Sequence, residues 1–295
     1  IKVCEYYLSA VYDAFHQELL TQDIVHTDET TFRVLESQKE RTYYWVLQSS
    51  KHHERPIVYY AHRDGRGQDK FDSVVGNYQG VIHCDMYSVY PSHAKSHDTI
   101  QLAGCWAHLR RKFYEAYVPS ADDDSLPARI VRQIGILFHK EKHWQSLSVE
   151  DRLHQRQRQL KPLIQDLFRT IEQCYANQVY RGKFYEALRY ALNHRSHFYT
   201  VLTDGRLELS NNAAERSMRS VVMGRKNQLF TRSFAGARAG AILLSLLETA
   251  KRYQVDGRAY IEYLLTHLPN EPSLIGRDLS GYMPWDPHIQ AVCRI

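Results

Sequence analysis

Hydrophobic and polar positions follow two different periods in the first part of the chain. Residues 3–20 carry apolar side chains at helical spacing, which predicts a helix. From Asp23 onward β-branched and aromatic residues dominate, and the pattern predicts strands at 24–34, 41–48 and 57–62. Because the connections between these strands are short and polar, they favour an antiparallel meander.

A second group of elements follows the meander. A short helix is predicted at 69–78, and Gly80 ends it. The mostly apolar run 81–85 predicts a central fourth strand, and 100–104 predicts a short fifth strand. An amphipathic helix begins near Trp106. Strands interrupted by a helix and followed by further helices indicate an α/β protein with a mixed sheet.

The rest of the chain has a helical pattern with few interruptions. A polar loop is predicted at 119–125, and from about 127 to 200 the pattern is helical only. Further helices are predicted at 239–253 and at 258–268, and Asp256 is placed to cap the second of them.

Composition narrows the partners and the compartment. Lys and Arg total 38 against 33 Asp and Glu, and the net charge of +5 permits a polyanionic partner without requiring one. The five cysteines are irregularly spaced and form no Cys-x-x-Cys, which argues against a disulfide framework and predicts a reducing, cytosolic setting. There is no signal peptide and no long apolar run, so no membrane association is expected. The chain starts at Ile1 and enters helical sequence directly, so we expect it to be the C-terminal part of a longer protein.

One polar turn leads into a helix in which an acid stands among cations. Glu215 lies one turn inside this helix, with Arg219 four residues further on the same face. Two upstream carboxylates lie on predicted strands, Asp28 within the first and Asp85 at the end of the fourth. If these strands are neighbours, the two carboxylates meet. Three carboxylates can hold two divalent cations about 3.5–4 Å apart for phosphoryl transfer, and Mg²⁺ prefers such oxygen ligands.

Each of these residues also has an ordinary structural interpretation. Asp28 could be an exposed strand residue, Asp85 could begin a turn, and Glu215 could form a capping box with the asparagine three residues before it. Cys105 and His108 could hold zinc, but two further ligands are missing, so packing is the simpler interpretation. The density of cations around Glu215 favours phosphate contacts over a solvated face.

Six segments carry a resemblance to a known family. They are HTDET at 26–30, CDMYSVY at 84–90, CWAHLRRKF at 105–113, NNAAER at 211–216, GRKNQLF at 224–230 and LETAK at 247–251. In these segments the sequence resembles the transposases of the insertion-sequence-66 family, the TnpC-type proteins of bacterial mobile elements. The matches run in the family's order over nearly the whole chain, and the third and fourth segments together are highly specific.

The resemblance implies a fold and a catalytic triad. The fold would be RNase H-like, α/β, with a mixed five-stranded sheet flanked by helices. The triad would be Asp28, Asp85 and Glu215, and these carboxylates would bind Mg²⁺, for which Mn²⁺ could substitute.

The resemblance also implies a domain organisation. The spacing of 130 residues between the second and third acids fits an all-helical insertion at 119–200. The catalytic core would then comprise 1–118 and 201–268, and an irregular C-terminal tail would follow at 269–295.

Residues around the triad receive roles from the same resemblance. Basic side chains would hold DNA phosphates without reading base sequence. They are Arg110, Arg111, Lys112, Arg216, Arg219, Arg225 and Lys226. Four further residues would brace the site, namely Cys105, His108, Asn211 and Asn212.

The expected activity is metal-dependent cleavage of transposon ends and strand transfer into target DNA. The expected partners are double-stranded DNA, further copies of the chain in a homo-oligomer, and accessory proteins encoded by the element, in the cytoplasm at the nucleoid. Ser210 stands where the family usually has Asp. The family's N-terminal DNA-binding and oligomerisation region has no counterpart in the sequence, so we expect this chain alone to cut poorly at specific ends. An RNase H-like nuclease or resolvase without strand transfer, and an inactive DNA-binding remnant, are the alternatives.

Overall fold

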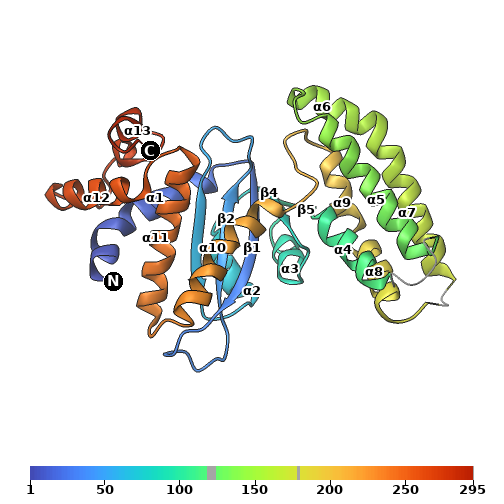
Figure 1. Ribbon diagram of the computed structural model, residues 1–295, viewed down its shortest axis with the longest axis horizontal. Helices are drawn as coiled ribbons and strands as arrows, with labels where there is room; N and C mark the ends of the chain where they lie inside the picture. The colour runs from blue at the N-terminus through green and yellow to red at the C-terminus, as the bar shows by residue number, and fades with distance from the viewer. Residues whose placement is uncertain (118–123, 178–179, 295) are drawn as a thin grey trace. The chain divides into compact units, whose positions relative to one another are not determined.

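The computed structural model describes residues 1–117, 124–177 and 180–294. Within them, five strands form one sheet in the order β3-β2-β1-β4-β5 (Figure 1). The strands are β1 Ile24–Phe32, β2 Thr42–Ser49, β3 Val58–Arg63, β4 Gly80–Cys84 and β5 Ile100–Gly104. The sheet is mixed, open and flanked by helices, which is consistent with an RNase H-like fold and confirms the predicted fold class. Each strand lies within two residues of its predicted bounds.

Contacts divide the chain into two compact units. The first unit comprises Ile1–Ile82, Ser92–Ile100 and Ala213–Ile295, and the second comprises His83–Pro91 and Gln101–Asn212. The first unit therefore holds the meander and the last helices, whereas the second is almost entirely helical.

The register of the meander decides which side chains share a face of the sheet. Asp28 on β1 lies opposite Val46 on β2, which lies opposite Tyr60 on β3. Residues directly opposite one another on antiparallel strands point to the same face, so these three side chains form one row. Their neighbours Glu29 and Trp45 point to the other face, because side chains alternate along a strand.

Helices cover both faces of the meander in the first unit. The helices that follow the second unit in the chain are α10 Asn212–Gln228, α11 Phe234–Arg252 and α12 Gly257–His267, and those before β4 are η1 Cys4–Leu8, α1 Ser9–Leu20 and α2 Gln68–Val75. Ala214 and Met218 of α10 and Ala237 of α11 join Val46 and Tyr60 in one buried apolar cluster. On the other face, Phe71 of α2 lies with its ring 5.3 Å from that of Trp45.

The outer edge of the sheet is closed by hydroxyl groups rather than by another strand. The main-chain N–H of Tyr60 donates to Ser245 Oγ at 2.8 Å, and that of Val58 donates to Thr249 Oγ1 at 3.1 Å. Ser245 and Thr249 are buried and stand one turn apart on α11. An exposed edge strand would offer unpaired main-chain groups to other chains, so α11 both covers this edge and satisfies its polar groups.

The second unit packs helices around a small aromatic centre. Its helices are α4 Trp106–Ala116, α5 Leu126–His143, α6 Val149–Gln155, η2 Arg156–Leu160, α7 Lys161–Ala176, α8 Gly182–Asn193, α9 Arg195–Tyr199 and η3 Thr200–Leu202. Between β4 and β5 runs α3 Val89–Lys95. The ring of Trp106 lies 5.1 Å from that of Phe198 and 6.3 Å from that of Phe168. The three side chains are fully buried and join α4, α7 and α9.

Arg156 is buried and holds a turn of the main chain in the second unit. Its guanidinium group donates to the carbonyl oxygens of Val201 at 3.1 Å, Asp204 at 2.9 Å and Leu207 at 2.6 Å. Its Nε also donates to the Glu141 carboxylate at 2.9 Å. A buried cation is tolerated here because its donors meet acceptors and its charge meets a carboxylate.

One predicted helix starts later than the observed one, and one predicted cap is confirmed. The helix predicted at 239–253 begins at Phe234, because Ser233 caps it by accepting from the Gly236 N–H. Asp256 caps α12 as predicted, accepting from Ala259 N–H at 2.7 Å.

The prediction of an irregular C-terminal tail is wrong in part. Short 3-10 turns occur at Leu268–Asn270 and Ser280–Tyr282, and α13 Pro287–Val292 is a helix capped by Asp286. Its prolines suggested irregular backbone, but proline is compatible with the first helical position, and Pro287 occupies it.

The predicted loop at 119–125 lies largely outside the described residues, as does the predicted boundary at 118/119. The other predicted domain boundaries stay predictions. None of the helices in the described parts of the chain has the length and apolarity needed to cross a membrane.

Replacing Arg156 by Met is expected to destabilise the chain strongly. The variant keeps the aliphatic stem but leaves Glu141 and three carbonyl groups without their donor, and breaking a buried ion pair costs about 3–5 kcal/mol. Urea unfolding followed by circular dichroism measures the change. The matched control is Arg169→Met, whose ion pair with Asp166 is exposed (66% and 58%) and should contribute less than about 1 kcal/mol. Equal effects of the two variants would contradict the role given to Arg156.

Candidate active site

Asp28 lies in the middle of β1, which has a neighbouring strand on each side. Its side chain is half-buried and faces the helices α10 and α11, because it shares a row with Val46 and Tyr60. Asp28 Oδ1 accepts a hydrogen bond from the Glu29 N–H at 2.9 Å. The strand therefore fixes the main chain, and a local hydrogen bond fixes one carboxylate oxygen.

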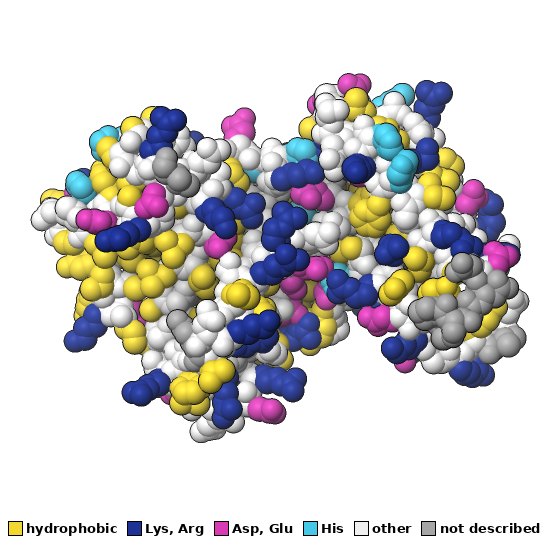
Figure 2. Space-filling model, viewed as in Figure 1, with side chains coloured by type: hydrophobic (Ala, Val, Ile, Leu, Met, Phe, Trp, Pro, Cys, Tyr) yellow, Lys and Arg dark blue, Asp and Glu magenta, His cyan; other side chains and the backbone are white. Residues whose placement is uncertain are grey.

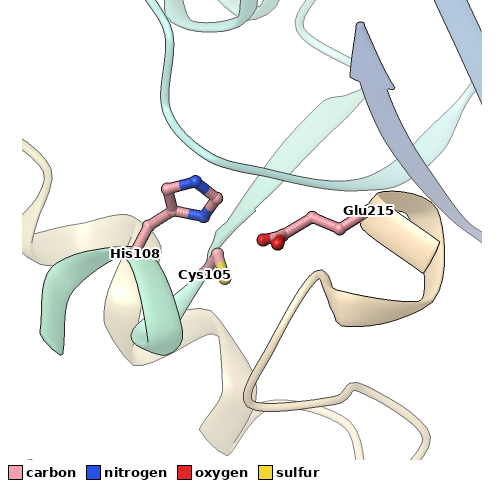
Figure 3. A group of neighbouring side chains, drawn as sticks. All are labelled: Cys105, His108 and Glu215. Carbon is pink, nitrogen blue, oxygen red and sulfur yellow. The ribbon is translucent and has the colours of Figure 1, made fainter. Parts of the chain in front are cut away.

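Glu215 lies in the first turn of α10, where Figure 3 shows its side chain extending from the helix. The buried stripe of this helix is formed by Ala214, Met218 and Val221, which recur at helical spacing and pack on the sheet. Glu215 is next to that stripe and half-buried. Asp28 and Glu215 thus belong to one layer of the first unit, the face of the meander and the helix packed on it.

The position of α10 on the sheet is set by buried polar contacts as well as by its apolar stripe. The Tyr60 hydroxyl donates to the Ser217 carbonyl at 2.7 Å, and the Ser217 hydroxyl bonds to the amide oxygen of Gln48. One turn on, the Ser220 hydroxyl donates to Glu248 of α11 at 2.7 Å. Apolar packing permits a helix to slide, whereas these bonds are satisfied in one position only. They therefore fix the first turns of α10, and with them the main chain of Glu215.

Asp85 directly follows β4 and belongs to the second unit. Its Oδ1 accepts from the Tyr87 N–H at 2.8 Å, and its main-chain carbonyl accepts from the Tyr190 hydroxyl of α8 at 2.7 Å. β4 lies beside β1 in the sheet, so the condition under which the two carboxylates were expected to meet is fulfilled. The convergence of the Asp85 carboxylate with those of Asp28 and Glu215 stays a prediction.

Charged and titratable side chains surround Tyr190. Lys112 Nζ lies 4.6 Å from the centre of the Tyr190 ring, a cation–π contact. Burial, the neighbouring His197 and the charge of Lys112 together lower the pKa of His194 to about 4, and the Asp85 carboxylate opposes them. Burial also raises the pKa of Tyr190 above its ordinary value, so its hydroxyl keeps the proton that it donates to the Asp85 carbonyl.

Cys105 joins two segments that carry site residues. It is buried directly before α4, its N–H donates to the Cys84 carbonyl at 3.0 Å, and its Sγ accepts from the Asn211 N–H at 3.2 Å. The next residue, Trp106, donates its N–H to the Leu209 carbonyl at 2.9 Å. The end of β4 and the segment that leads into α10 are thus joined to the same turn, and the predicted role of Cys105 and Asn211 in bracing the site stays a prediction.

The other two predicted bracing residues differ in exposure. His108 is half-buried one turn further along α4, where Figure 3 shows its ring, and its Nε2 lies 3.4 Å from an Arg111 nitrogen. Asn212 is exposed and lines an open hollow of 630 Å³ in the second unit, together with Arg110, Arg111 and other residues of α4 and α5. The roles predicted for His108 and Asn212 stay predictions.

The cations predicted to bind DNA fall into two groups. Those with exposed side chains are Arg110, Arg111, Lys112, Arg216, Arg219 and Lys226. Arg225 is half-buried, and its guanidinium group donates to the carbonyl and the hydroxyl of Thr31 at 2.8 and 2.9 Å. Arg225 therefore joins the end of α10 to β1, so its substitution would also change the fold locally.

Comparison with known proteins now places the chain. Residues 1–239 match the family described as "Transposase IS66 family". The chain belongs to the IS66 transposase family. It is 32% identical over 275 residues to uncharacterized protein y4qI of Sinorhizobium fredii (strain NBRC 101917 / NGR234), a match that covers 89% of this chain and 50% of the relative.

Two further relatives in the same organism are similar. They are the uncharacterized proteins y4hP, 29% identical, and y4jD, 26% identical, each matched over 95% of this chain and over 53% and 57% of the relative. The chain thus spans about half the length of these relatives. No solved structure matches it.

Sequence reasoning missed the residues that position the acids. Gln48 and Ser217 carried a weak signal, since each is a polar residue at a core-facing position of its element. Tyr190 carried none, because it stands 105 residues from Asp85 and only the tertiary fold brings its hydroxyl there.

Ser217→Ala is expected to lower the free energy of unfolding by about 1–3 kcal/mol, because the buried amide oxygen of Gln48 loses its donor. The double variant Ser217→Ala/Gln48→Met removes both polar partners and should recover part of that loss. Urea unfolding of the parent, of the single variants Ser217→Ala and Gln48→Met, and of the double variant gives the coupling energy. Strict additivity, within about 0.5 kcal/mol, would mean that the two side chains do not interact.

Lys112→Met should raise the pKa of His194 above about 4, because it removes a nearby positive charge while retaining the aliphatic stem. NMR titration of the histidine ring signals measures this, with exposed Lys183→Met as the control that leaves the pKa unchanged.

Since the folded pKa of His194 lies below the unfolded value of about 6.5, the neutral ring stabilises the fold above pH 6.5. This stability is lost as the pH falls from about 6.5 towards 4. A His194 pKa near 6.5 in the parent chain would contradict this picture.

Proposed function

We propose that the chain carries the catalytic core of an Asp-Asp-Glu DNA transposase. Asp28, Asp85 and Glu215 would bind Mg²⁺, with Mn²⁺ as a substitute. In the first step water attacks a phosphodiester at the transposon end and releases a 3′-hydroxyl. In the second step that hydroxyl attacks a phosphodiester of the target DNA, and the target's own 3′ oxygen leaves. Family membership supports the reaction class, and the common layer of Asp28 and Glu215 is the observation that carries the site assignment.

The donor atoms fit a hard divalent cation. All three side chains offer carboxylate oxygens, which Mg²⁺ prefers over nitrogen or sulfur. Asp28 and Asp85 each have one oxygen fixed by a main-chain N–H, and Glu215 stands on a helix held by buried bonds. Rigid support of this kind is what a metal-binding site needs, because the ligands must keep their geometry without the ion.

A bound pair of divalent cations would activate the attacking oxygen and neutralise charge that develops on the phosphate. The chain's own contribution is positioning. Lys226 and the exposed arginines of α10 would hold the DNA backbone by charge, with no base-specific contact. Arg225 would act indirectly, by holding the end of α10 against Thr31.

The assembly follows from the reaction. Joining two transposon ends needs at least two active sites, so we propose a homo-oligomer in the active complex, with accessory proteins of the element as further partners. The chain spans about half the length of its relatives. That the full-length protein cleaves transposon ends and joins them to target DNA is therefore also a proposal. We place its action in the cytoplasm, at the nucleoid.

Asp85→Asn is expected to reduce strand transfer at least about 100-fold while DNA affinity changes less than about threefold, since the substitution affects charge at the reacting phosphate rather than backbone contacts. The assay uses the chain, Mg²⁺ and a pre-cleaved transposon end with a supercoiled target. Exposed Asp98→Asn is the matched control and should behave like the parent chain.

The outcomes separate the competing functions. Unchanged strand transfer in Asp85→Asn would exclude the triad. Cleavage without joining by the parent chain would indicate a nuclease or resolvase. A parent chain that binds DNA but neither binds Mn²⁺ nor reacts would indicate an inactive remnant. Ser210, at the position where the family usually has Asp, is the observation that suggests this alternative.

A further inference from the structure

Two connections of the first unit meet at one end of the sheet. The segment after β1 runs beside the segment that joins α10 to α11, through a bridge between Val34 and Thr231. The Leu35 N–H donates to the Thr231 carbonyl at 2.9 Å, and the Thr231 N–H donates to the Arg33 carbonyl at 3.0 Å. We call residues 33–36 and 229–232 the tip. Because main-chain bonds join its two segments, the tip is a fixed projection.

The tip exposes large apolar side chains. Leu229 is 67% exposed, Leu35 49% and Phe230 39%, while the neighbouring Val34 is buried. Single apolar residues on a surface are ordinary, but three large exposed ones on two adjoining segments make the tip a candidate contact surface.

Leu229 also has an unfavourable backbone conformation. It follows α10 with φ of 60°, and its N–H donates to the Arg225 carbonyl at 2.8 Å. This is the position after a helix where glycine or asparagine is usual, because a Cβ is strained there. The chain thus holds a large apolar side chain outward at a position where a smaller residue would be more stable.

Cations surround these apolar side chains. Exposed Arg33, Arg41, Lys226 and Arg232 lie on or next to the tip. Two exposed acids stand against these four cations: Glu40, directly before Arg41, and Glu36 within the tip, which accepts from the Phe234 N–H at 2.7 Å. Figure 2 shows hydrophobic and Lys or Arg side chains together at the end of the first unit where these two connections lie in Figure 1. The surface therefore combines an apolar projection with a positively charged surround.

We propose that the tip is a DNA-distorting wedge: Leu229, Phe230 and Leu35 press against a base step of duplex DNA while the surrounding cations hold the flanking phosphates. Proteins that kink DNA insert apolar side chains between base steps in this way. The inference rests on the proposed function for its substrate, double-stranded DNA, and adds a contact that is separate from the triad. A second copy of the chain would account for the apolar side chains but not for the concentrated positive charge.

Unstacking at one step would serve the proposed reaction. Unstacking a base step kinks the duplex and changes the direction of the backbone on either side. The free energy of this deformation depends on the sequence of the step. The tip would therefore prefer flexible steps without making hydrogen bonds to base edges. Such a preference is a property of the DNA shape, and phosphate contacts alone would not create it.

The experiment uses the chain and short duplexes that carry 2-aminopurine, whose fluorescence rises when the base is unstacked. The parent chain should increase the fluorescence at a flexible step. The double variant Leu229→Gln/Phe230→Gln should abolish this increase and weaken binding about tenfold, with an unchanged dependence on salt. Ile275→Gln, at a side chain that is 94% exposed, is the matched control and should behave like the parent.

Two further variants separate the wedge from the fold and from the charges. Leu229→Gly relieves the backbone strain, so the chain should be at least as stable, yet it should lose most of the fluorescence increase. Lys226→Gln/Arg232→Gln should weaken binding to all sequences and reduce the slope of log affinity against log salt by about 2.

The outcomes distinguish this inference from the proposed function. A fluorescence increase that survives in the Leu229 and Phe230 variants would overturn the wedge. If the Leu229 and Phe230 variants keep the fluorescence increase and sedimentation shows that they no longer self-associate, the tip joins copies of the chain instead. Asp85→Asn should keep the increase. A parent chain that distorts DNA without strand transfer would support the wedge while the transposase proposal fails, and a parent chain that binds no DNA would overturn both.

Discussion

The placement of α10 on the sheet is the constraint on which the candidate site depends. This helix carries Glu215, and its apolar stripe packs on the same row of the meander that contains Asp28. Apolar contact alone fixes the face of the helix but not its position along the axis. The bonds that Tyr60 and Gln48 make with Ser217 fix the position of α10 along its axis. A shift of the helix by one residue would leave buried polar groups without partners.

The other parts of the site are held by the same kind of contact. Tyr190 donates to the carbonyl of Asp85, and Cys105 joins the end of β4 to Asn211 just before α10. In the second unit, Arg156 holds the turn at 201–207 that precedes this segment. The long helical stretch between the second and third acids therefore does more than separate them in sequence. It contributes the donors that fix the main chain on which Asp85 stands and on which α10 begins.

The sequence was sufficient for those elements whose local pattern agrees with their surroundings. The β-branched run that contains Asp28 is a strand, the apolar run before Asp85 is a strand beside it, and Asp256 caps a helix as its spacing indicated. The start of α11 was missed because glycine and alanine residues at 235–240 carry little periodic signal, and the cap at Ser233 decides it. The sequence could not predict the bond from Tyr190 to Asp85 or the bond from Arg225 to Thr31. The partners are far apart in the chain, and a tyrosine or an arginine is also common on an exposed surface.

A common feature of these contacts bears on how the site tolerates change. Tyr60, Tyr190 and Arg156 all donate to main-chain carbonyl oxygens, which every residue type provides. The main chain at Asp85 is therefore held whatever its side chain is, and the main chain beside Glu215 is held through Ser217. At the two positions, the atoms that hold the main chain therefore differ from the carboxylate oxygens proposed to bind the metal. By contrast, the strained, exposed Leu229 costs stability. A contact outside the chain, such as the one proposed for the tip with duplex DNA, would account for a large apolar side chain in this position.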